Sequence, residues 1–183
     1  MAFDHPGTGE TTAPLDAFAD EVIAGLISQA RQAGNGRVAH FGLSFGGNFP
    51  ALSGLSGLSG AAIGLGGPVE ASFGPENLQR LMFGLAGIGG NADGFTAPPT
   101  PAQQIDAARP FIRRALLDQH ANAPILVING ADDVHVVQAD TLVFQGRPDT
   151  EVHLIPGTGH VAASKLPEVM PVIISWLRAR LAA

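Results

Sequence analysis

The sequence contains no cysteine. This absence excludes a disulfide framework, a thiolate nucleophile and a zinc site built on cysteine. Charged residues are scarce as well, at 14% of the chain, and 10 basic against 16 acidic side chains give a formal net charge of -6 without a basic run. Because nucleic acids are bound by clustered Lys and Arg, we expect no nucleic-acid partner.

Long apolar runs are also absent. No stretch reaches the roughly 18 residues that a membrane-spanning helix requires, and the N-terminus lacks the basic-then-apolar pattern of a signal peptide. We therefore expect no membrane partner and a cytoplasmic protein. The chain has 183 residues, of which 45% are hydrophobic, and this suffices for one domain with a sizeable core.

The most informative feature is a serine between glycines after a strand-like run. Arg37–Phe41 is such a run, and it leads into the pentapeptide Gly42-Leu43-Ser44-Phe45-Gly46. This pattern is typical of a nucleophile elbow, a sharp strand-to-helix turn that pushes the serine hydroxyl out towards a base. An ordinary glycine-rich turn can have the same pentapeptide, so the rest of the sequence has to decide between them.

An acid and a histidine each follow a later strand. Pro124–Ile128 is an apolar run of the kind that is buried on both faces, and it leads to Asp132 and Asp133. Val152–Ile155 predicts another strand, and His160 follows it in a loop. The order serine, acid, histidine is the one found in α/β-hydrolases, whose three side chains converge above the strand ends.

On these residues the sequence resembles the α/β-hydrolase superfamily, in particular its single-domain esterases, thioesterases and carbon–carbon bond hydrolases. The resemblance covers nearly the whole chain. Its four motifs are the turn Asp4–Glu10, the elbow Gly42–Gly47, the acid segment Ile128–Val137 and the stretch Gly157–His160. It implies an α/β fold in one domain over residues 1–183, with a mostly parallel sheet, helices on both faces and a small helical lid insertion at about residues 67–122.

The alternation of strands and helices along the chain favours the same mostly parallel sheet. Apolar residues at helical spacing predict a first helix from Leu15 to Ala30, with Gly34 as its stop, and a last helix over Leu166–Leu181. Ala61–Leu65 predicts a strand between the elbow helix and the lid.

The resemblance also implies a role for each residue of the site. Ser44 is the expected nucleophile, His160 the general base, and Asp133 the group that orients the imidazole. The backbone N–H of Phe45 is the expected donor to an oxyanion. We expect no cofactor.

The acid is a choice between two neighbouring residues. We favour Asp133 because the segment of the resembling family reads Gly-x-x-Asp, and we interpret Asp132 as a turn-forming carboxylate. Asp132, Asp133 and His135 together would be an alternative metal cluster. The strand-end position already explains both carboxylates, so we expect no metal.

The expected partner is a small-molecule substrate with an apolar portion. Phe73, Met82 and Phe83 lie in the predicted lid and offer apolar surface for it, while His5 lies in a loop that the resembling family brings near the pocket rim. A small helical layer that only packs on the sheet would explain the same apolar residues.

The implied activity is that of a serine hydrolase, which cleaves a carboxylic ester, a thioester or an activated ketone through an acyl-serine intermediate. Two alternatives stay open. One is a catalytically silent protein that uses the fold for binding or assembly, and the other is a cyclase or lyase that uses the same pocket without hydrolysis.

The start of the sequence departs from the family pattern. Met1–Asp4 corresponds to the end of a strand that members of the family reach only after several earlier strands, so the resemblance implies an N-terminally truncated fold. Arg37–Phe41 would then be an edge strand with unpaired backbone groups. We expect another copy in a homo-oligomer, a partner chain or a local rearrangement to cover this edge.

Overall fold

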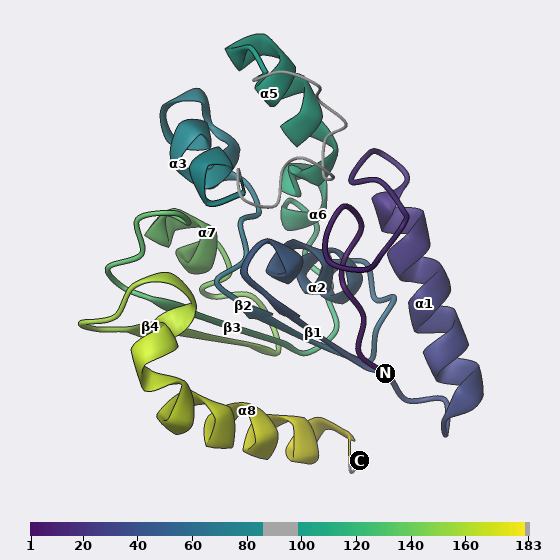
Figure 1. Ribbon diagram of the computed structural model, residues 1–183. Coiled ribbons are helices and arrows are strands. Elements are labelled where there is room, and N and C mark those ends of the chain that lie inside the picture. Colours follow the sequence, from purple (N-terminus) through teal and green to yellow (C-terminus); the bar gives the residue numbers. More distant parts are fainter. Residues whose placement is uncertain (86–98, 182–183) are drawn as a thin grey trace.

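A parallel four-stranded sheet forms the centre of the protein in a computed structural model that describes residues 1–85 and 99–181. The strands lie side by side in chain order (Figure 1): β1 (Ala39–Leu43), β2 (Ala61–Leu65), β3 (Ile125–Gly130) and β4 (Thr150–Ile155). Because all neighbouring pairs are parallel, the four carboxyl ends lie at one edge of the sheet. The predicted parallel sheet is confirmed.

The strand register aligns the carboxyl ends of β1, β2 and β3. Leu43 at the end of β1 lies opposite Leu65 of β2, and Leu65 lies opposite Ile128 of β3. Ser44 follows Leu43 directly after β1 and Asn129 follows Ile128 within β3, so both lie near the carboxyl ends of the strands.

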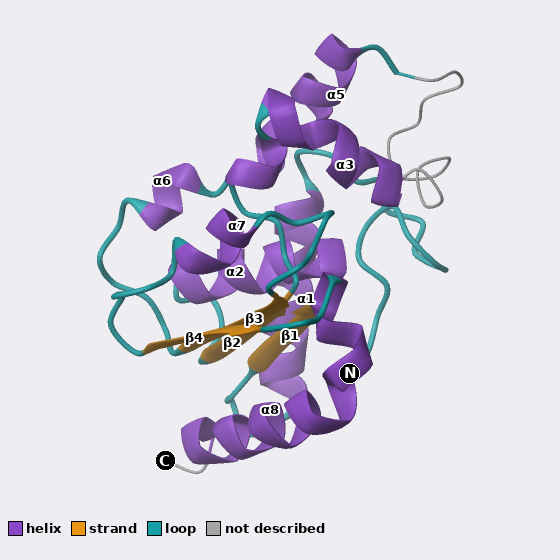
Figure 2. Ribbon diagram, turned by 90° about the vertical axis from the view of Figure 1, so that its left-hand side faces the viewer, coloured by secondary structure: helices purple, strands orange, loops and turns teal. Residues whose placement is uncertain are grey.

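Helices cover both faces of the sheet, as predicted (Figure 2). On one face lie α2 (Asn48–Leu55) and α7 (Gln138–Leu142), with α1 (Ala19–Ala33) beside α2. On the other face lies α8 (Leu166–Leu181).

Side chains of the two buried strands alternate between these helices. On β3, Leu126 packs in one core cluster with Ile173 of α8, whereas its neighbour Val127 packs in another cluster with Leu55 of α2. This alternation is the period of two that a strand imposes. Since both faces are covered, β2 and β3 are buried at every position, and Asn129 near the end of β3 is their one polar residue.

A further helical layer lies between β2 and β3 in the sequence and beyond α2 and α7 in space (Figure 1). Its described elements are η2 (Ala71–Phe73), α3 (Pro75–Leu85), α5 (Pro101–Ala108), η3 (Arg109–Phe111) and α6 (Arg114–Leu117). This is the segment predicted as a lid insertion, and its function as a lid stays a prediction.

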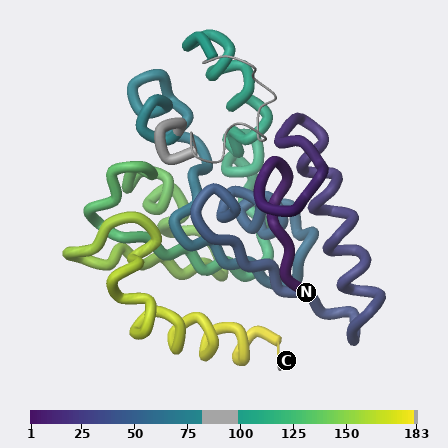
Figure 3. Tube along the Cα trace, in the orientation of Figure 1, coloured from purple at the N-terminus to yellow at the C-terminus, as the bar shows by residue number. Residues whose placement is uncertain are grey.

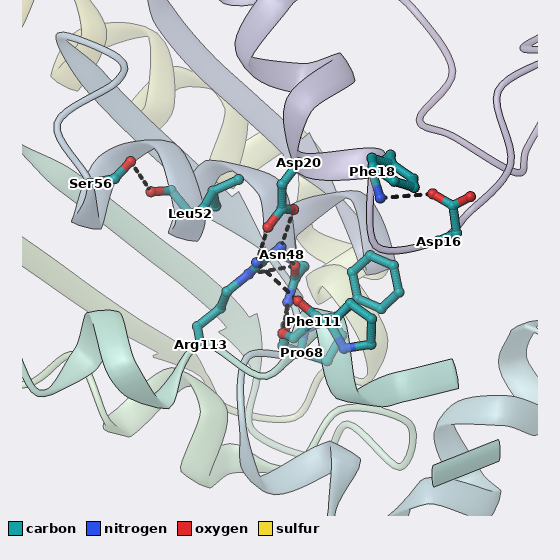
Figure 4. A network of polar contacts seen from close by, with 10 residues as sticks. Asp16, Phe18, Asp20, Asn48, Leu52, Ser56, Pro68, Phe111 and Arg113 are labelled. Carbon is teal, nitrogen blue, oxygen red and sulfur yellow. Dashed lines mark hydrogen bonds and ion pairs between the residues drawn. The ribbon is translucent and has the colours of Figure 1, made fainter. Parts of the chain in front are cut away.

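A buried arginine joins this layer to α1 and α2 (Figure 4). The guanidinium of Arg113, whose side chain is 4% exposed, donates to both carboxylate oxygens of Asp20 at 2.6 and 2.8 Å and to Oδ1 of Asn48 at 2.9 Å. Asn48 Nδ2 in turn donates to the carbonyl oxygens of Pro68 and Phe111, both at 2.8 Å. The three segments therefore share one hydrogen-bond network.

β1 is an edge strand and pairs only with β2 among the described residues. Phe41 and Leu43 on this strand are 42% and 50% exposed. The N-terminal segment runs between β1 and α1 (Figure 3), and the three border a groove of about 510 Å³. The prediction that another chain covers this edge stays a prediction.

Within residues 1–85 and 99–181, no helix combines the length and the apolar character needed to cross a membrane.

Candidate active site

The turn after β1 holds Ser44 in a strained conformation. Ser44 has φ of 57°, a left-handed value that is rare for residues other than glycine, and it opens the 3-10 turn η1 (Ser44–Gly47) that leads into α2. A Cβ at Gly42 would lie 2.1 Å from the carbonyl oxygen of Gly46. Glycine is therefore required at position 42 for the strand and the helix to approach this closely.

A close contact between two further glycines, Gly47 and Gly67, packs the elbow against the loop after β2. A Cβ at Gly47 would lie 2.7 Å from Cα of Gly67, and a Cβ at Gly67 would lie 2.4 Å from the carbonyl carbon of Gly47. These distances leave no room for a side chain on either residue. The two backbones therefore pack directly on each other and fix the height of the elbow above the sheet.

The structure brings Ser44, His160 and Asp133 into one hydrogen-bonded row. Ser44 Oγ lies 2.7 Å from Nε2 of His160, and Nδ1 of the same ring lies 2.7 Å from Oδ2 of Asp133. The three residues follow β1, β4 and β3, respectively. Asp132 is exposed, and its backbone N–H donates to the carbonyl of Thr158, so Asp133 and not Asp132 meets the imidazole.

The ionisation of Asp133 determines the direction of these hydrogen bonds. Burial of this carboxyl favours its neutral form, but hydrogen bonds from His160, from Asn129 and from the backbone N–H of His135 outweigh burial and hold its pKa below the ordinary value. An ionised carboxylate only accepts hydrogen bonds, so Nδ1 of His160 donates to it. Nε2 of the neutral ring then accepts from the hydroxyl of Ser44.

Asn129 connects the acid loop to the histidine loop. Its Nδ2 donates to Oδ2 of Asp133 at 2.8 Å, while its Oδ1 accepts from the backbone N–H groups of Gly130 at 2.8 Å and Val161 at 3.1 Å. Asn129 is completely buried. Our sequence analysis missed this role, although an amide at the end of an otherwise apolar strand was the available signal.

The backbone just after His160 is strained. Val161 and Ala162 have φ of 54° and 48°, which is unusual for a β-branched residue in particular. The bond from Val161 N–H to Asn129 helps to hold this conformation, and Ala162 is fully buried. The surrounding structure thus fixes the backbone on which the imidazole is mounted.

Phe45 lies where an oxyanion donor was predicted. It follows Ser44 at the N-terminal end of η1, where backbone N–H groups have no partner within the helical turn. Its ring is buried against Phe49, Phe73 and Phe111 in edge-to-face contacts, with centroid distances between 5.4 and 6.4 Å. This aromatic cluster anchors the elbow.

The structure describes the side chains of two of the four residues predicted to contact substrate, His5 and Phe73. His5 packs on Phe45 at 5.5 Å, and burial lowers the pKa of its imidazole. Phe73 is 5% exposed and belongs to the core cluster around Phe45. Met82 lies on α3, but its side chain is outside the described residues, as is that of Phe83. Substrate contact by these four residues stays a prediction.

A second imidazole lies beside His160. The rings of His135 and His160 meet edge to face, with centroids 5.4 Å apart. In the sequence we considered His135 as part of a metal cluster. The part of the chain that the structure describes holds no group of three His, Asp or Glu side chains placed to bind a metal ion.

Comparisons with known proteins give relatives by structure alone. No family model and no curated protein matches this sequence. Among solved structures, AbyA5 superposes with a TM-score of 0.75 at 18% identity, over 98% of this chain and 54% of its own. The chain thus spans about half the length of AbyA5.

This chain covers a larger share of two further solved structures. The monoacylglycerol lipase of Paleococcus ferrophilus has a TM-score of 0.68 at 15% identity, over 98% of this chain and 82% of its own. Est1E from Butyrivibrio proteoclasticus has a TM-score of 0.66 at 17% identity, over 92% and 72%. Together with the parallel sheet, the helices on both faces and the turn at Ser44, these likenesses show that the chain has the α/β-hydrolase fold.

Proposed function

We propose that this protein is a serine hydrolase that cleaves a carboxylic ester, a thioester or an activated ketone through an acyl-serine intermediate. The observation that carries the proposal is the row of two 2.7 Å hydrogen bonds from Ser44 through His160 to Asp133. A serine hydroxyl next to an imidazole that a buried carboxylate orients is the arrangement that activates serine for attack. Est1E and the lipase share the fold, which supports a hydrolase.

The chemistry follows from the direction of the hydrogen bonds. Ser44 Oγ attacks the carbonyl carbon, and its proton passes to Nε2 of His160, so that the imidazolium forms next to the carboxylate of Asp133. The N–H of Phe45 donates to the oxyanion of the tetrahedral intermediate. The intermediate collapses to the acyl-serine as the leaving group takes the proton from His160. Water then repeats the sequence, releases the acid and restores Ser44.

A fluorophosphonate probe tests the proposal directly, because it reacts with activated serine. We expect labelling of the wild-type protein at Ser44 and loss of labelling in Ser44→Ala. Ser56→Ala is the matched control, since Ser56 is exposed and its hydroxyl only donates to the carbonyl of Leu52. Hydrolysis of p-nitrophenyl esters of increasing chain length would then measure the size of the acyl site. Labelling that persists in Ser44→Ala would contradict the proposal.

A catalytically silent binding protein is the second candidate. The observation that favours it is the length of the chain, which spans 54% of AbyA5, and whole-protein activity need not reside in such a part. The same labelling experiment separates the two candidates. A folded protein in which no serine reacts with the probe supports the silent one.

A further inference from the structure

One arginine near the candidate active site has no polar partner for its guanidinium among residues 1–85 and 99–181. Among the described residues, every arginine except Arg80 and Arg178 donates a hydrogen bond from its guanidinium or, in the case of Arg180, forms an ion pair with Glu151. Arg178 is exposed on α8, the helix that lies on the face of the sheet opposite α2 (Figure 2). Arg80 is exposed on α3, in the helical layer on the side of the sheet where α2 lies.

Arg80 borders an open groove between α3 and the loop after β3. The groove has a volume of about 570 Å³ and is lined by Gln79, Arg80, Val134 and His135. Val134 is 64% exposed, which is high for an aliphatic side chain. The lining therefore combines one permanent positive charge with an apolar wall.

The groove is next to the row of hydrogen-bonded residues. His135 forms its wall on one side and touches the ring of His160 on the other, with centroids 5.4 Å apart. Nδ1 of His135 lies 3.4 Å from the carbonyl oxygen of Arg80, so the histidine also spans the distance to α3. One imidazole, that of His135, therefore separates the groove from the ring of His160.

No carboxylate among the described residues forms an ion pair with Arg80. Asp133 accepts hydrogen bonds from His160, from Asn129 and from backbone N–H groups. Glu76, one turn before Arg80 on α3, accepts from the side chain of Asn77 and forms no ion pair with another described residue. Since none of the described residues pairs with it, the guanidinium of Arg80 is available for an anion.

We propose that this groove binds a carboxylate carried by the substrate, and that the substrate is a half-ester of a dicarboxylic acid or a similar ester with an anionic end. Arg80 supplies the charge and the planar donor pair that carboxylates match, and Val134 packs on the aliphatic part of the chain. This inference rests on the proposed hydrolase function, for which it names a substrate class.

The test compares two esters that differ in this charge and in one methyl group. The mono-p-nitrophenyl ester of glutaric acid has a free carboxylate, and methyl p-nitrophenyl glutarate has an uncharged methyl ester in its place. We expect a higher kcat/KM for the charged ester, and a ratio of the two values that falls about tenfold, or about 1.4 kcal/mol, in Arg80→Gln. Arg178→Gln is the matched control, and it should leave the ratio unchanged. A ratio that is the same in Arg80→Gln and wild type overturns the inference.

A binding experiment keeps this inference separate from the hydrolase proposal. Free glutarate is titrated into Ser44→Ala, which cannot form an acyl-serine, and into the same protein with Arg80→Gln added, with NMR shifts of the histidine ring protons as the readout. Saturable binding that Arg80→Gln weakens supports the groove even if neither ester is hydrolysed. If glutarate does not bind, or binds independently of Arg80, the proposed carboxylate site is refuted, even if methyl p-nitrophenyl glutarate is hydrolysed well.

Discussion

Mild acid should destabilise this protein through His40, a histidine buried under the elbow helix. Its side chain lies on β1, 8% exposed, with Nδ1 2.9 Å from Oγ of Ser53, and Ser53 in turn accepts from the hydroxyl of Ser59 at 3.1 Å. Burial disfavours the charged imidazolium and lowers the pKa of His40 from 6.5 to about 4.

The size and the sign of the effect follow from this pKa. In the unfolded chain His40 takes up a proton near pH 6.5, whereas in the folded protein it stays neutral until about pH 4. Its contribution to stability is therefore complete above pH 6.5 and is lost as the pH falls from 6.5 to about 4. At about 1.4 kcal/mol for each pH unit, the loss is about 3 kcal/mol, a large part of the stability of a domain of this size.

Urea unfolding at a series of pH values between 7 and 4 would measure this loss. We expect the free energy of unfolding of the wild type to fall about 3 kcal/mol further than that of His40→Gln, which has no titrating group at this position. His5, whose pKa is also lowered by burial, is present in both proteins, so its contribution cancels. His120→Gln, at an exposed histidine, should follow the wild type. Parallel curves for wild type and His40→Gln would refute the reasoning.

Two further predictions concern the free energy of unfolding. Arg113→Ala should lower the free energy of unfolding by about 3–5 kcal/mol, because Asp20 is left without its buried partner, whereas Arg114→Ala, which removes exposed ion pairs with Glu70 and Asp118, should lower it much less; equal losses in urea unfolding would contradict this. Gly47→Ala should destabilise by at least about 1–3 kcal/mol because its Cβ meets Gly67. Gly25→Ala on α1, where a Cβ meets nothing within 4 Å, should instead stabilise by about 0.4–1 kcal/mol in thermal unfolding, and a loss in both would refute the steric argument.

Short apolar runs bounded by glycine predicted the sheet well, because strands buried on both faces need apolar residues at every position. Ala61–Leu65 has the same bounds in the sequence prediction and in the structure. The elbow could be recognised because its geometry depends on neighbouring residues, namely a strand, a serine and the glycines beside it. The last helix also lies at the predicted residues, Leu166–Leu181.

Two features could not be predicted from the sequence, namely the start of the first helix, which a local hydrogen bond decides, and a contact between two distant loops. The first helix begins at Ala19 and not at Leu15, because Asp16 accepts from the backbone N–H of Phe18 and holds a turn where helical spacing predicted a helix. The contact between His135 and His160 depends on how two loops from different strands pack together. No pattern in the sequence around either residue contains that information.

The hydrogen bond from Ser44 to His160 joins the two outer margins of the sheet. Ser44 follows β1 and His160 follows β4, and these strands have no backbone contact with each other, because β2 and β3 lie between them. Edge strands open to solvent more readily than central ones, so their amide protons exchange with deuterium sooner. This single hydrogen bond therefore links the loops that follow β1 and β4. Acylation of Ser44 breaks the bond and should speed amide exchange in these two strands, while the amides of β2 and β3 stay protected.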